Sequence, residues 1–178
     1  MRVAVITPYY KTPRPWLEQC HQSVLDQTHS CTHFLIADGL PAPYVDDWQA
    51  QHIVLGANHA DYGDTPRAVG SVCAIGQGYD AIAYLDADNW FMPDHIESLV
   101  ELHKQTGAAV CISNRTMNRL DGSLLGPCDE TDGEFFADTS CLMLTRKAFG
   151  VAPVWAMFDP HLHPICDRLM MHTIRSRG

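Results

Sequence analysis

Short apolar runs rich in β-branched residues alternate along the chain with segments whose apolar residues recur at helical spacing. The runs expected to be strands are residues 2–7, 33–38, 53–55, 81–86, 108–113 and 140–145. The segments expected to be helices are 16–25, 65 to 76 or 78, 93–107 and 164–175. Alternation of this kind favours parallel strands, because a helix carries the chain back to the start of the next strand. We therefore predict an α/β fold with a mostly parallel central sheet flanked by helices.

Two Thr-Pro pairs mark the expected beginnings of the first two helices. Thr12 and Thr65 are each followed by proline, which predicts an N-cap residue and a proline in the first turn. Residues 114–137 are polar and rich in glycine, so we expect a long excursion there. The chain has 178 residues, enough for a single domain with a full core.

The charge balance restricts the partners of the chain. Twelve Lys and Arg against 21 Asp and Glu give a formal net charge of −9. Nucleic acids require basic patches, so we expect no nucleic-acid partner. A phosphate ligand stays compatible with this balance, because a bound divalent cation inverts the local field. No apolar run approaches the roughly 20 residues of a transmembrane segment, and residues 3–6 are too short for a signal peptide, so we expect a cytoplasmic chain.

Candidate ligand-binding residues stand at the ends of three expected strands, at Thr7-Pro8, Asp38 and Asp86. Parallel sheets bind ligands outside the carboxyl ends of their strands, so we expect the site there. Asp86 and Asp88 are two residues apart, and in extended backbone such side chains point the same way. Two converging carboxylates suit Mg²⁺ or Mn²⁺, completed by phosphates and water. From the pattern alone, an acidic loop with ordinary turn chemistry stays an open alternative.

Other metal and nucleotide patterns fit less well. The spacing over residues 86–97 resembles an EF-hand loop, but Phe91 occupies the position that requires glycine. Residues 76–81 match G-x-G-x-x-A, yet they precede a strand instead of following one. The clusters H-x-C-x-H at 29–33 and H-x-H at 161–163 lack the paired spacing of structural zinc sites, so structural roles are the simpler interpretation.

Three blocks resemble the inverting GT-A glycosyltransferases of family 2. Residues 3–10 (VAVITPYY) and 23–28 (SVLDQT) resemble the opening strand and the S-x-L-x-Q-T helix of that family. Residues 34–39 (FLIADG) resemble its second strand, which usually ends in D-D-G. Residues 81–89 (AIAYLDADN) resemble the strand that carries the D-x-D motif. The blocks occur in the family's order and spacing, and the resemblance implies a GT-A fold.

The resemblance assigns roles around the nucleotide. Thr7, Pro8 and Asp38 match the positions that hold the nucleotide base. Asp86 matches the first Asp of the D-x-D motif, which meets the ribose or a metal-bound water. Asp88 matches the second Asp, which binds the metal. Both aspartates are thus the implied residues for a divalent cation, Mn²⁺ or Mg²⁺.

Two further residues complete the implied site. Arg67 lies in the helix before the D-x-D strand, where relatives often place a basic residue near the nucleotide. Asp167 matches the Asp of a Glu-Asp pair that supplies the general base for the acceptor hydroxyl. Cys166 replaces the Glu of that pair, and Asp138 is the second candidate for the base.

The resemblance also implies which substrates the chain uses and how its domain is divided. The reaction would move a hexose or N-acetylhexosamine from a nucleotide-diphosphate sugar, UDP-linked by family habit, to a glycan or lipid-linked hydroxyl acceptor. Residues 1–107 would bind the nucleotide and residues 108–178 would form the acceptor side of one GT-A domain. Many relatives continue beyond the last helix, so a truncated acceptor side stays open. Also open are a third metal ligand from His161, His163 or His172, and peripheral contact with the inner membrane face.

Two other functions stay open at this point. A non-catalytic nucleotide- or sugar-binding module on the same fold is compatible with Cys166 in place of Glu. A sugar nucleotidyltransferase is the other candidate. It would be expected to carry a glycine-rich phosphate loop after the first strand, and residues 7–11 contain no glycine.

Overall fold

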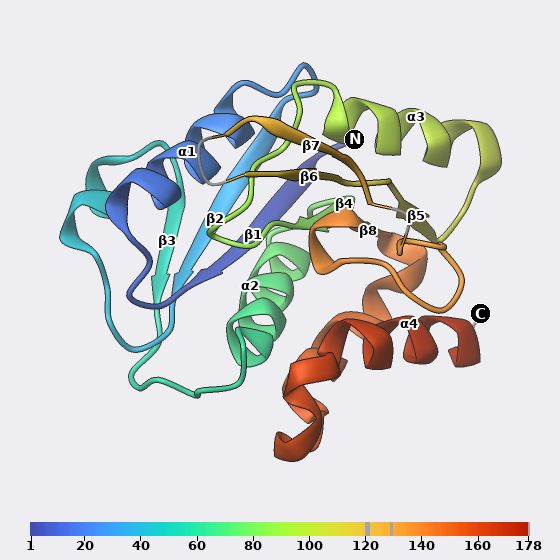
Figure 1. Cartoon of the computed structure of the whole chain (residues 1–178). Coiled ribbons are helices and arrows are strands. Elements are labelled where there is room, and N and C mark those ends of the chain that lie inside the picture. The colour runs from blue at the N-terminus through green and yellow to red at the C-terminus, as the bar shows by residue number, and fades with distance from the viewer. Residues whose placement is uncertain (120–121, 129, 178) are drawn as a thin grey trace.

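A six-stranded sheet forms the centre of the molecule. The computed structural model describes residues 1–119, 122–128 and 130–177, and its strand order is β3-β2-β1-β4-β8-β5 (Figure 1). The strands are β1 Val3–Tyr9, β2 Cys31–Ala37, β3 Gln51–Val54, β4 Ala81–Tyr84, β5 Val110–Ile112 and β8 Leu142–Thr145. The first four run parallel, and β8 is antiparallel to both of its neighbours, β4 and β5. The predicted mostly parallel α/β sheet is confirmed.

Helices cover both faces of this sheet (Figure 1). One face is packed by α1 (Arg14–Leu25) and α3 (His95–Thr106), and the other by α2 (Asp64–Gly76) and α4 (Cys166–Arg177). Shorter 3₁₀ segments are η1 Pro43–Asp47, η2 Thr139–Cys141, η3 Arg146–Met157 and η4 Pro160–Ile165. β1 is buried along its whole length, as expected for a parallel strand covered on both faces. Within the described residues, no helix is both long and apolar enough to cross a bilayer.

The predicted caps of the first two helices are wrong in detail. The N-cap of α1 is Pro13, not Thr12, and no side chain caps it. The N-cap of α2 is Gly63, so Thr65 lies inside the first turn. Asp61 acts in its place, because its carboxylate accepts from the backbone N–H of Gly63 (3.1 Å) and of Thr65 (2.8 Å). A negative carboxylate also complements the positive end of the helix dipole.

The expected excursion at 114–137 contains a small second sheet. β6 (Thr116–Asn118) and β7 (Leu124–Pro127) pair as an antiparallel hairpin that the sequence did not predict. Leu124 and Leu125 are mostly exposed, so this hairpin lacks the buried face whose pattern reveals a strand in sequence. Positions 120, 121 and 129 of the excursion lie outside the described residues.

A glycine sets how closely α2 approaches the sheet. A Cβ on Gly70 would meet Ile6 Cγ2 at 2.7 Å and Ile36 Cδ1 at 3.0 Å, both in the core. We expect Gly70→Ala to lower the free energy of unfolding by about 1–3 kcal/mol, because the added methyl group forces a shift of helix or strands. Urea unfolding followed by circular dichroism measures this change.

Gly76 on the same helix provides the matched control. A Cβ there meets nothing within 4 Å. Gly76→Ala should therefore leave stability unchanged or raise it by up to about 1 kcal/mol through helix propensity. Equal stability of the two variants would contradict the proposed close packing at Gly70.

Candidate active site

A cleft of about 580 Å³ opens at the carboxyl ends of β1, β2 and β4; we call it the first cleft. The segment after β1 and the 58–63 loop form much of its wall, and Trp16 of α1 contributes to it. Five predicted site residues line it: Pro8, Asp38, Arg67, Asp86 and Asp88. The sequence-based expectation that the site lies at this edge of the sheet agrees with the position of the cleft.

Strained backbone is concentrated on the first cleft. Within the described part of the chain, the non-glycine residues with positive φ are Lys11 (52°), Ala60 (54°) and Tyr62 (58°), and all three line this cleft. Such conformations cost roughly 1–3 kcal/mol each and persist where the surrounding structure enforces them, often at ligand sites. The strain is an indication of function that the sequence did not reveal.

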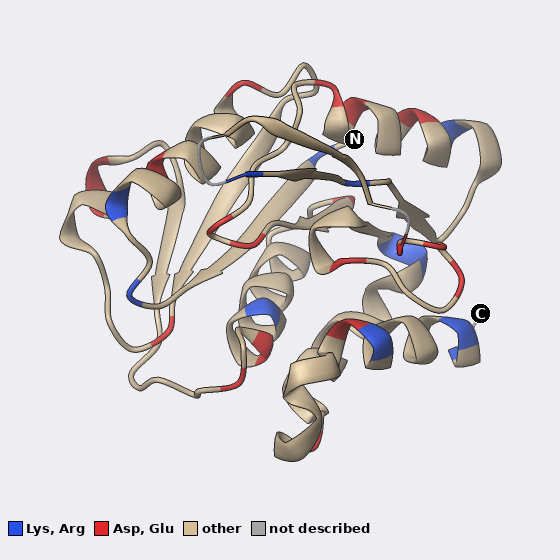
Figure 2. Ribbon diagram, in the orientation of Figure 1, with Lys and Arg blue, Asp and Glu red and all other residues tan. Residues whose placement is uncertain are grey.

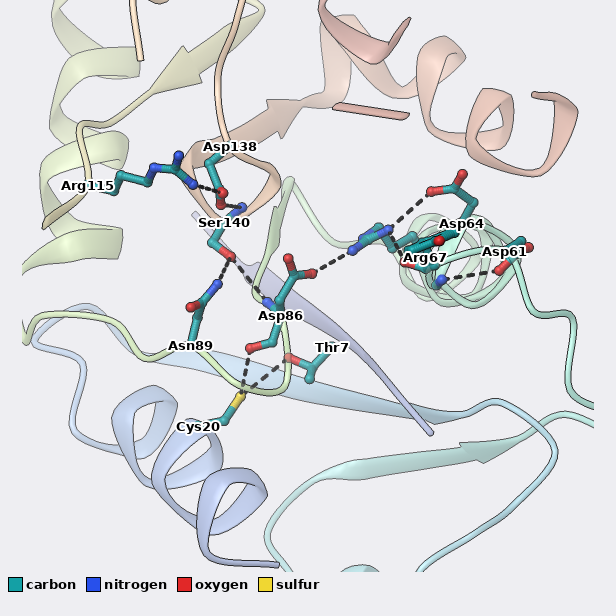
Figure 3. Close-up of polar contacts among 12 residues, drawn as sticks. Thr7, Cys20, Asp61, Asp64, Arg67, Asp86, Asn89, Arg115, Asp138 and Ser140 are labelled. Atoms are coloured by element: carbon teal, nitrogen blue, oxygen red, sulfur yellow. Dashed lines mark hydrogen bonds and ion pairs between the residues drawn. The ribbon is translucent and has the colours of Figure 1, made fainter. Parts of the chain in front are cut away.

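Asp86 lies at the centre of the polar contacts in the site (Figure 3). Its Oδ1 accepts a hydrogen bond from Arg67 Nη2 at 2.5 Å. Its backbone N–H donates to the Ser140 hydroxyl at 3.2 Å, and the Asn89 amide donates to the same hydroxyl. Ser140 is a site residue that sequence reasoning missed, since nothing in its local pattern links it to Asp86.

The guanidinium of Arg67 lies between two carboxylates. Arg67 Nη1 contacts Asp64 Oδ1 at 3.1 Å, while Nη2 holds Asp86. Burial alone would lower the pKa of Arg67, but the negative charge of Asp86 and Asp64 outweighs burial and raises that pKa. Arg67 is thus a permanent positive charge at the first cleft.

Asp88 lies where two clefts meet. The second cleft, of about 530 Å³, is lined by the loop after Asp88, by parts of the 114–122 segment and by the 138–141 segment. Trp16 and Asp88 line both clefts. A ligand in the first cleft and another in the second would therefore meet beside the Asp88 carboxylate.

The two aspartates offer a donor set that fits a divalent cation. Asp88 is exposed and, among the described residues, has no ion-pair partner. Asp86 uses only Oδ1 for Arg67, which leaves Oδ2 available. No group of three or more His, Cys, Asp or Glu suited to a metal occurs in the described ranges. Two carboxylates of this kind fit Mg²⁺, which proteins usually hold through one or two carboxylates together with substrate phosphates and water.

Thr7 and Pro8 are separated by the structure. Thr7 is fully buried, with its hydroxyl 2.8 Å from His33 Nε2 and 3.9 Å from Cys20 Sγ. Pro8 lines the first cleft and packs against Gly63, where a Cβ would meet Pro8 Cγ at 2.8 Å. The side chain of Thr7 therefore points into the interior, and of this pair only Pro8 lines the first cleft.

Asp38 lines the first cleft with both of its oxygens engaged. Oδ1 is 2.6 Å from His59 Nδ1, and Oδ2 accepts from the Asn58 amide (2.8 Å) and the His59 backbone (3.1 Å). In this arrangement Asp38 holds the 58–63 loop in place. Asn58, which also lines the cleft, is a second residue that sequence reasoning missed.

Asp138 lines the second cleft and is held firmly. Its Oδ2 pairs with the Arg115 guanidinium, and its Oδ1 accepts from the Ser140 backbone at 2.9 Å. Burial raises the pKa of Asp138, and the negative charges of Asp86 and Asp167 contribute to the rise. Asp138 therefore lies within electrostatic reach of both Asp86 and Asp167.

Asp167 lies in the first turn of α4, one residue after the helix begins at Cys166, and it is not among the described residues that line either cleft. It is half-buried, and its Oδ1 accepts from the Arg168 backbone at 2.7 Å. Among the described residues, its Oδ2 has no partner. Burial raises the pKa of the neighbouring Cys166 thiol to about 12, so this thiol stays protonated at neutral pH.

Members of both histidine clusters make hydrogen bonds within the described part of the chain. In the first, His33 is buried and contacts His21 and Thr7, whereas His29 is bound to the Met1 carbonyl. In the second, His163 is bound to Asp64. Their simpler structural interpretation agrees with these contacts.

The sheet order, the helices on both faces and the acidic cleft at the strand ends define a GT-A fold protein. The family model "Glycosyl transferase family 2" matches residues 67–159, just over half of the chain. The chain therefore belongs to glycosyl transferase family 2. The matched range includes the D-x-D strand, Asp138 and Ser140.

Solved structures of one bacterial protein share this fold. S. aureus TarS 1-349 is 12% identical with a TM-score of 0.70, and the alignment covers 98% of this chain and 55% of that one. Its complex with UDP is 12% identical with a TM-score of 0.65, covering 98% and 55%. Its complex with UDP-GlcNAc is 10% identical with a TM-score of 0.62, covering 96% and 54%. This chain thus spans about half the length of those structures, and no curated protein sequence matches it.

Proposed function

We propose that the chain transfers a sugar from a nucleotide-diphosphate sugar, UDP-linked, to a hydroxyl acceptor with inversion. The observation that carries the proposal is the position of Asp88 at the junction of the two clefts, beside Asp86 and Arg67. Family membership and the UDP and UDP-GlcNAc complexes of the structurally similar TarS support it. The sugar is a hexose or N-acetylhexosamine, and the acceptor is a glycan or a lipid-linked glycan.

Each group has a role in this proposal. The first cleft binds the donor, with the nucleotide base near Pro8, Asp38 and Asn58. Asp88 and the free oxygen of Asp86 would hold Mn²⁺ or Mg²⁺, which would offset the charge that develops on the departing diphosphate. Asp167 accepts the proton of the acceptor hydroxyl as that oxygen attacks the anomeric carbon.

Asp88→Asn tests the proposed donor site. We expect the wild type to bind UDP in the presence of Mn²⁺ and the variant to lose at least about tenfold in affinity. Even residues that only orient metal ligands are worth about 10- to 100-fold. Isothermal titration calorimetry with UDP, with and without Mn²⁺, measures this.

Asp94→Asn is the matched control, because Asp94 is an exposed carboxylate on the same segment that lines neither cleft. It should bind UDP as the wild type does. If Asp88→Asn binds UDP with the same dependence on Mn²⁺ as the wild type, the proposed metal site is refuted. A wild type that binds neither UDP nor GDP under any metal condition would favour a non-catalytic module.

A further inference from the structure

Four side chains form a continuous series from the segment before α4 to the D-x-D motif. His163 of η4 lies with Nδ1 2.7 Å from Asp64 Oδ2, although the two residues are 99 positions apart. Asp64 Oδ1 accepts from Arg67 Nη1 at 3.1 Å, and Arg67 Nη2 donates to Asp86 at 2.5 Å. Figure 3 shows the part of the series from Asp64 to Asp86. In Figure 2 a basic segment lies beside an acidic one at the beginning of α2.

The first three members of the series are shielded from water. The side chain of Asp64 is 0% exposed, that of Arg67 5% and that of His163 12%. An ionised carboxylate can only accept, so His163 must carry its proton on Nδ1 when it donates to Asp64. Because buried polar groups are costly to leave unpaired, each member depends on the next for its orientation.

Other contacts remove the remaining freedom of Arg67. Its Nη1 also donates to the Tyr62 carbonyl at 3.0 Å, and its guanidinium lies over the Trp155 ring at 5.2 Å. Arg67 is therefore held on several sides with Nη2 directed at Asp86.

We propose that His163 and Asp64 are positioning residues for the donor site, a role that rests on the proposed function. They fix Arg67, and through Arg67 they fix the carboxylate of Asp86. Neither belongs to the described lining of the first cleft, so neither touches the donor. Asp167 follows His163 by four residues, so the same contact connects the segment that carries the proposed base with the D-x-D motif.

A purely structural role makes a different prediction. If the series only stabilised the fold, its loss would lower the unfolding temperature and leave donor affinity unchanged in the folded protein. A positioning role predicts weaker donor binding in a protein that is still folded. Donor affinity measured well below the lowest unfolding midpoint separates the two.

The test compares His163→Ala, His163→Asn and Asp64→Asn with wild type in calorimetric titrations of UDP and Mn²⁺, alongside thermal unfolding. We expect His163→Ala and Asp64→Asn to bind UDP about 10- to 100-fold more weakly, as for other residues that orient metal ligands. His163→Asn should recover most of the affinity, because its amide N–H replaces the imidazole donor. His161→Ala is the control, since its exposed side chain has no hydrogen bond within the described residues.

The outcomes separate this inference from the proposed function. Wild-type affinity in both His163→Ala and Asp64→Asn overturns the positioning role. The positioning role is also overturned if His163→Ala loses UDP affinity and His163→Asn does not recover it. A wild type that binds no UDP overturns the proposed function itself, whatever the variants do.

Discussion

Asp167→Asn should reduce the turnover number by about 10²- to 10⁴-fold while leaving the affinity for UDP within about threefold of wild type. The amide keeps the size of the carboxylate but cannot accept the acceptor proton. Asp167 is half-buried in the first turn of α4, and within the described structure one of its oxygens has no partner. Turnover of donor and acceptor, with UDP binding measured in parallel, gives both quantities.

Asp138→Asn distinguishes the second candidate for the base. Both oxygens of Asp138 already accept hydrogen bonds, one from the Arg115 guanidinium and one from the Ser140 backbone. To act as a base, Asp138 would have to give up an ion pair, so we expect Asp138→Asn to reduce turnover less than Asp167→Asn does. A larger loss in Asp138→Asn would assign the base to Asp138 instead.

Arg67→Met should lower the free energy of unfolding by about 3–5 kcal/mol, because it leaves a buried carboxylate without its counter-charge. Asp64 is fully buried, and burial already raises its pKa. Without Arg67 that pKa rises further, so the folded variant gains stability by binding a proton as the pH falls. The difference from wild type should therefore shrink at lower pH. Urea unfolding at several pH values measures this.

Arg146→Met is the matched control for this prediction. Arg146 pairs with Asp80 at 2.9 Å, but its side chain is 60% exposed. Exposed ion pairs contribute about 0–1 kcal/mol, so this variant should differ little from wild type. Equal losses in the two arginine variants would show that burial of the Arg67 pairs does not decide their contribution.

The alternation of strands and helices could be predicted from the sequence, because apolar residues repeat at one spacing in a helix and at another in a strand. The strand from residue 81 and the helix from residue 93 were expected close to where β4 and α3 lie, since their apolar residues repeat at fixed spacing. The predicted helix caps were wrong because the backbone geometry around each helix start decides which residue is the N-cap. That residue is Pro13 in α1 and Gly63 in α2, instead of Thr12 and Thr65. The β6–β7 pair was not predicted, because it has no buried face and its sequence therefore shows no alternation of apolar and polar residues.

The positions of Asp86 and Asp88 also follow from the chain alone. Both come directly after an apolar strand, and the ends of parallel strands share one edge of the sheet. The orientation of Thr7 was not readable. β1 is buried on both faces, so no alternation of polar and apolar residues shows which side chains point to the cleft and which to the interior.

The contacts that complete the site were decided by tertiary structure. His163 reaches Asp64 across 99 positions, and Ser140 reaches Asp86 across 54. No local sequence pattern predicts these pairs. Each buried polar group needs a partner, and the packing of α2, η4 and η2 determines which complementary group lies near it. The sequence thus determined the elements and the acidic edge of the sheet. The fold decided which side chains hold that edge in place, because a buried charge requires a partner and only packing determines which one is near.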